Sequence, residues 1–105
     1  MAKNVADDIN SATADLADAV RREAELEDNR INVKMGAIER IMRAGDNSLT
    51  GKPHSFSSAE ALVNTDETYS SYLAQIRDAV HARIVARGAY DAAIATARLT
   101  AELAS

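Results

Sequence analysis

The sequence predicts an all-α protein, an antiparallel hairpin of two long helices with a short helical turn in the connection. Apolar residues recur at spacings of three and four along both halves of the chain, as in helices that pack on one face. One stretch with glycine, proline and several serines separates the halves. No segment alternates with the period of two that is typical of a half-buried β-strand.

The first helix is predicted over about residues 4–44. Charged residues dominate between Arg21 and Arg30, so the apolar seam thins there. Gly45 predicts the end of the helix, because glycine commonly follows a helix end. The apolar stripe consists of Val5, Ile9, Ala12, Leu16, Val20, Ala24, Ile31, Met35, Ile38 and Met42.

The connection is predicted as a loop over residues 45–57 followed by a short helix at about 58–63. Pro53 disfavours helical geometry at the residue before it. Ser57 and Glu60 have the spacing of a capping box, in which the serine accepts from the backbone of the glutamate. Phe56 is then interpreted as a hydrophobic staple that packs on the helix after the cap.

The second long helix is predicted over about residues 66–104, with Thr65 ahead of the acidic first turn. The connection is too short to reach back along either helix, so the two helices are expected to run antiparallel within one domain, residues 1–105. This arrangement places Arg83 and Arg87 opposite Glu23 and its acidic neighbours, which predicts ion pairs between the helices.

Apolar residues outside the main apolar stripe of each helix predict a homodimer with four helices. They are Leu26, Ile41, Tyr72, Val85, Leu99 and Leu103. The alanine-rich segment 86–104 contributes little apolar area per residue, so a lone hairpin would be marginally stable. The candidate dimer contacts are Tyr72, Val80, Ile84 and Tyr90.

The composition argues against an enzyme and predicts no cofactor or metal. The 105 residues include no cysteine, and the two histidines, His54 and His81, are not spaced as metal ligands. Gly51-Lys52 is followed by Pro53 where a phosphate-binding loop needs serine or threonine. No apolar run approaches the length of a membrane span, so we expect a cytoplasmic protein.

Two sets of residues are candidate binding sites. Lys52, His54 and Phe56 combine a cation, an imidazole and an aromatic ring in the loop, which predicts a partner-binding loop. A candidate basic patch consists of Arg40, Arg43, Lys52 and Arg77. That patch would suit a nucleic-acid accessory protein of recombination or replication, although the net charge of -4 does not favour this alternative.

The loop also carries a resemblance. Thr50-Gly51-Lys52-Pro53-His54-Ser55, followed by Ser57-Ser58-Ala59-Glu60, resembles the linker of small phage- and prophage-encoded helical proteins. The resemblance covers about residues 50–63 and implies a virus-associated accessory protein in the host cytoplasm, with no residue roles carried across. The leading hypothesis is therefore a non-catalytic interaction protein that binds an unidentified protein partner.

A secreted helical-hairpin effector is a third hypothesis. Length, acidity and the lack of cysteine are similar to the effector family that has a Trp-x-Gly turn. This chain contains no tryptophan, so the likeness is one of architecture.

Overall fold

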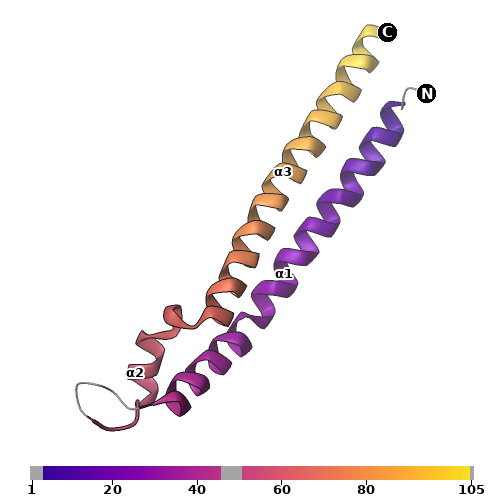
Figure 1. Cartoon of the computed structure of the whole chain (residues 1–105). Coiled ribbons are helices and arrows are strands. Elements are labelled where there is room, and N and C mark those ends of the chain that lie inside the picture. The colour runs from indigo at the N-terminus through magenta and orange to yellow at the C-terminus, as the bar shows by residue number, and fades with distance from the viewer. Residues whose placement is uncertain (1–3, 46–50, 105) are drawn as a thin grey trace. The chain divides into compact units, whose positions relative to one another are not determined.

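The structure, a computed structural model, describes residues 4–45 and 51–104. Its elements are α1 (Val5–Ala44), α2 (Phe56–Ala61), the 3-10 turn η1 (Val63–Thr65) and α3 (Glu67–Ala104). Figure 1 shows the two long helices, with α2 where the chain turns back. The described residues contain no β-strand. The predicted all-α hairpin with a short helical turn in its connection is thus confirmed.

Helix α1 begins and ends close to the predicted residues. The Asn4 side-chain oxygen Oδ1 accepts the Asp7 N–H at 2.8 Å, and aspartates occupy the first turn, where they stabilise the positive end of the helix. The helix ends at Ala44, immediately before Gly45. Part of the predicted loop 45–57, residues 46–50, lies outside the described residues.

The prediction for the start of the short helix is wrong by two residues. Ser55, in extended geometry, caps α2 because its hydroxyl oxygen accepts the Ser58 N–H at 3.2 Å. Phe56 is therefore the first helical residue, and the staple interpretation, which needs it before the cap, is wrong. Serines at 55 and 57 both have side chains that can cap a helix, and in the observed helix Ala59 is fully buried.

Helix α3 begins within one residue of the prediction, but a different side chain caps it. Asp66 Oδ1 accepts the Tyr69 N–H at 2.9 Å. Thr65, which the sequence suggested for this position, instead ends η1 and donates its hydroxyl to the Leu62 carbonyl at 2.7 Å. The 3-10 turn η1 thus lies between the end of α2 and the start of α3.

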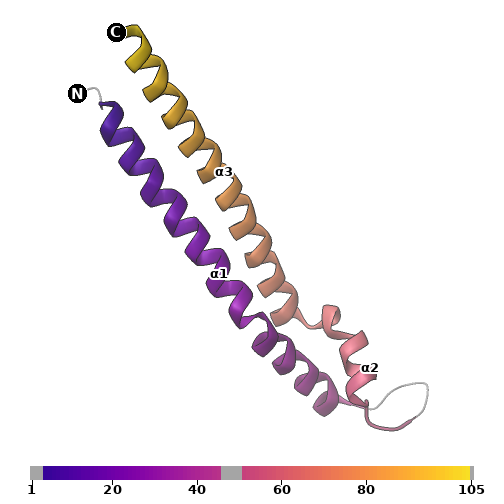
Figure 2. The same cartoon turned by 180° about the vertical axis from the view of Figure 1, so that it is seen from behind.

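The chain divides into two compact units, which we call the turn unit, residues 25–77, and the terminal unit, residues 1–24 with 78–105. The division falls in the charged stretch of α1 where the sequence predicts a thin apolar seam. In each unit a segment of α1 lies beside a segment of α3, as the views from the front and from behind agree (Figure 1, Figure 2).

The turn unit has the main hydrophobic core. Its central residues are Ala37, Ile38, Ala59, Val63 and Tyr69, and Val33, Ile41 and Leu73 pack against them. The core therefore draws on all four helical elements. Contacts from Leu26 to Tyr72 and from Arg40 to Asp66 show the antiparallel direction, because the partner number falls as the α1 number rises.

The terminal unit buries much less. Among its described residues only two alanines, Ala12 and Ala79, are buried. The Arg83 guanidinium donates to the Glu23 carboxylate, which confirms one predicted ion pair between the helices. The prediction for Arg87 is wrong, because it pairs with Asp91 one turn along the same helix, at 3.3 Å, and lies 5.9 Å from the centre of the Tyr90 ring.

Candidate interaction surface

The three residues of the predicted partner-binding loop differ in burial and in contacts. The His54 ring is half-buried, with Nδ1 2.7 Å from the Ser58 hydroxyl, so it supports the start of α2. Phe56 is 47% exposed on the first turn of α2, and Lys52 is exposed in the loop before it. The joint role of the three residues as a binding site stays a prediction.

Internal ion pairs occupy part of the predicted basic patch. Arg40 donates from Nε and Nη2 to the two oxygens of Asp66, both at 2.8 Å. This guanidinium, with backbone N–H groups of Tyr69 and Thr68, lowers the pKa of Asp66 from 3.8 to about 2. Arg43 lies 3.8 Å from Glu39 in the same helix, and Arg77 is exposed. Carboxylates thus offset two of the four charges, which weakens their field for phosphate binding.

The four candidate dimer contacts fall in different environments. The Tyr72 hydroxyl donates to the Leu26 carbonyl at 2.6 Å, so this residue joins α3 to α1 inside the turn unit. Val80 and Tyr90 are half-buried in the chain. Ile84 is 56% exposed. Of the four, Ile84 is the one that the chain itself leaves most open to a second copy.

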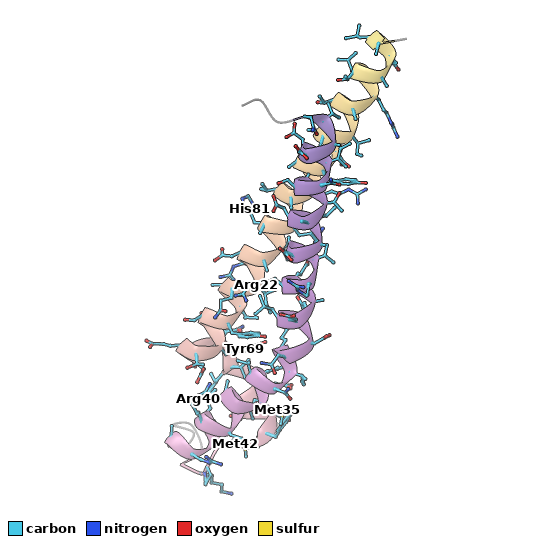
Figure 3. All side chains as sticks on the ribbon, turned by 90° about the vertical axis from the view of Figure 1, so that its right-hand side faces the viewer. Arg22, Met35, Arg40, Met42, Tyr69 and His81 are labelled. Carbon is cyan, nitrogen blue, oxygen red and sulfur yellow. The ribbon has the colours of Figure 1, made fainter. Side chains whose placement is uncertain are left out.

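A line of exposed apolar residues on α1 of the turn unit forms a surface that was not predicted from the sequence. The sequence placed Ile31, Met35 and Met42 in the core stripe beside Ile38. Ile38 is only 1% exposed, but Ile31 is 59% exposed and the two methionines are both above a third. Figure 3 labels Met35 and Met42 on this part of α1. We call Ile31, Met35 and Met42 the methionine line.

The exposure of this line follows from which flank of α1 the other elements cover. Val33, Ala37 and Ile41 face the core, and the sequence had assigned Ile41 to a position outside the stripe. Lys34 lies 3.5 Å from Glu60 and ties α1 to α2. The signal available in the sequence was the width of the apolar face, which exceeds what one partner helix covers.

Other surface features offer little for chemistry. An open groove in the terminal unit is lined by small residues of α3 and by Asp8, Ser11 and Asp15 of α1. His81 is exposed on α3 (Figure 3). Within residues 4–45 and 51–104, no group of histidines and acidic residues is arranged to hold a metal. No helix in this described part is both long and apolar enough to cross a membrane.

Comparison of the chain with protein-family models, with curated protein sequences and with solved structures finds no match.

Proposed function

We propose that this protein is a non-catalytic interaction protein, associated with a phage or prophage, that binds a protein partner through the methionine line of the turn unit. The observation that carries the proposal is the exposure of Ile31, Met35 and Met42 beside the main hydrophobic core. Large apolar side chains gathered on a surface mark interaction sites in soluble proteins.

The residue types suit an adaptable protein surface. Methionine has a flexible, polarisable side chain that repacks against differently shaped apolar partners. The spacing of four and seven residues places the three side chains on one side of α1, so they present a ridge along the helix. The chemistry that fits such a ridge is the apolar face of an amphipathic helix, bound between helices of the two proteins.

The turn unit holds this ridge in a fixed position. The paired Arg40 and Asp66 join α1 to the start of α3, and Tyr72 joins α3 back to Leu26 of α1. A preorganised surface binds with a smaller loss of conformational entropy than a mobile one. These cross-helix contacts therefore support a binding role for Ile31 and Met35, which lie between them on α1, and for Met42, which lies two residues beyond Arg40.

A capture experiment tests the proposal. Tagged wild-type protein and the double variant Met35→Glu/Met42→Glu are used to capture proteins from phage-infected or lysogenic cells, and the captured chain is identified by mass spectrometry. We expect a partner that the wild type binds directly as a purified protein and that the double variant binds at least about tenfold more weakly, since two buried charges would lack partners.

Val20→Glu is the matched control, because Val20 is also an exposed apolar residue of α1 but lies in the terminal unit. It should leave partner binding unchanged. Circular dichroism of all three proteins establishes that each stays helical. Equal partner binding by the wild type and the double variant would contradict the methionine line as the binding surface.

A further inference from the structure

The outer side of α3 in the terminal unit is apolar and has no partner within the chain. Ile84, Val85 and Leu99 are each more than half exposed, and Leu103 is 81% exposed. The half-buried side chains of this segment, among them Ala86, Tyr90, Ala93 and Ala97, occupy other helical positions. A helix that is apolar on more than one side is normally covered on more than one side.

A regular seam runs through this outer side. Val85, Gly88, Ala92, Ala95 and Leu99 follow one another at alternating spacings of three and four, which is the repeat of a coiled-coil contact. All five residues lack charge, and we call them the outer seam. The seam is short and has small residues at its centre, as expected where two helices approach closely.

Gly88 provides a separate indication of close approach. It lies in the interior of α3, where glycine is a poor helix former. A Cβ atom built at Gly88 meets no atom within 4 Å, so the folded chain itself does not require a glycine here. An approaching helix backbone or a large side chain from outside would require it.

We propose that the outer seam is the contact between two copies of this chain, whose α3 helices pair antiparallel about a twofold axis. The layers of an antiparallel pair then place Leu99 opposite the partner's Gly88 and Ala92 opposite the partner's Ala95. At each end of the contact the leucine of one copy packs against the glycine of the other, and at its centre the alanines pack against each other. The same patch serves both copies, as a twofold interface requires.

The charges beside the seam agree with this direction. Asp91 and Arg98 flank it on one side, seven residues apart and of opposite sign. In an antiparallel pair, residues at this repeat position of one helix face residues at the same repeat position of the other helix. Asp91 therefore faces the partner's Arg98, and Arg98 faces the partner's Asp91. In a parallel pair Asp91 would face the partner's Thr96 and Arg98 would face the partner's Leu103, neither of which carries a charge.

Dimerisation through the outer seam disturbs few existing contacts, and it buries apolar side chains in the terminal unit, which buries the fewest by itself. Asp91 now pairs with Arg87 in an exposed geometry, which is a weak interaction that it can share. The described terminal unit buries only Ala12 and Ala79 by itself. Covering Leu99 therefore adds a large apolar side chain of the kind that this unit lacks inside the single chain.

Charge reversal tests the interface in the full chain. Asp91→Arg gives a homodimer with two Arg–Arg contacts, and Arg98→Asp gives one with two Asp–Asp contacts. Each variant alone should dimerise at least about tenfold more weakly than the wild type in sedimentation equilibrium, because like charges repel. An equimolar mixture of the two should recover the dimer, since every contact between the copies then joins opposite charges.

Substitution of Gly88 gives a second test, in which helix stability and dimer affinity are expected to change in opposite directions. Gly88→Ala should stabilise the isolated helix but weaken dimerisation by about tenfold, because the added methyl group fills the space of the partner's Leu99. Gly36→Ala is the matched control, since Gly36 also lies inside a helix and its Cβ would meet only Arg40, at an ordinary 3.5 Å. That variant should dimerise as the wild type does.

Three outcomes would overturn the proposal. The first is a wild-type protein that stays monomeric from micromolar to submillimolar concentration. The second is a mixture of the two charge variants that associates no better than each alone, with circular dichroism showing all of them helical. The third is a Gly88→Ala protein that dimerises as tightly as the wild type.

Discussion

The turn unit and the terminal unit use the same two long helices but bury different kinds of side chain. In the turn unit, Ile38, Val63 and Tyr69 are buried together with alanines. The elements α2 and η1 contribute residues to this core in addition to those of the two long helices. In the terminal unit, only alanines are buried among the described residues. The cluster of large buried side chains thus lies in the unit where α2 and η1 add residues to the two long helices.

This comparison predicts where the chain is most sensitive to mutation. Ile38→Ala, in the turn unit, should lower the free energy of unfolding by about 2–5 kcal/mol, because it leaves a cavity at a fully packed position. Leu16→Ala, at a half-buried position of the terminal unit, should cost less than half as much. Denaturant unfolding measured on both variants checks the order, and equal losses would contradict the contrast between the units.

The start of α3 is the next most sensitive point. Asp66→Ala removes both the cap for the Tyr69 N–H and the partner of Arg40, and should cost about 1–2 kcal/mol. Asp66→Asn keeps an oxygen that can cap the helix and should cost less. Thermal melts of the two variants distinguish the contribution of the helix cap from that of the ion pair. If the asparagine variant is as unstable as the alanine variant, the loss of stability comes from the lost charge.

The hydroxyl of Tyr72 should contribute about 1 kcal/mol. Tyr72→Phe removes the donor to the Leu26 carbonyl but keeps the ring in place. Tyr90→Phe is the control in the terminal unit, where the described interactions of Tyr90 involve its ring and Arg87. Urea titrations should show a loss of stability for the first variant and almost none for the second.

The smallest effect is expected from pH. The pKa of Asp66 is about 2 in the folded chain, below its ordinary 3.8, so its charged form stabilises the fold. This contribution is fully present above about pH 4 and is lost as the pH falls toward 2, because the unfolded chain takes up the proton first. The stability difference between the wild type and Asp66→Asn should therefore shrink over that range, and a constant difference from about pH 5 to 2 would contradict the assigned cause.

The helix boundaries show how far local sequence patterns reach. Gly45 and the acidic start of α3 are local signals, and the predicted ends at these points lie within one residue of those observed. The start of α2 was misplaced because Ser55 and Ser57 both have capping side chains, and local sequence does not rank them. Ala59 of α2 is buried in a cluster with Ala37, Ile38 and Tyr69, and such packing depends on residues distant in sequence.

The candidate surfaces were harder to predict than the fold. The period of the apolar residues gave the correct class, because 3.6 residues per turn is a property of the backbone that the sequence reveals directly. The flank of a wide apolar face that stays exposed depends on where α2 lies, and periodicity carries no information on that. Met35 was therefore placed in the packing stripe although it is exposed, whereas Ile41 and Leu26, placed outside the stripe, face inward.

The sequence by itself determined two long helices, the break between them and their antiparallel return, because spacing, caps and connection length are properties of neighbouring residues. Only the tertiary structure decided that Ser55 caps α2, that Arg40 pairs with Asp66, and that Arg87 turns to Asp91. It also decided which apolar side chains stay exposed, leaving the methionine line and the outer seam uncovered. The physical reason is that burial is a property of pairs of surfaces, and a pattern along one helix describes only one of them.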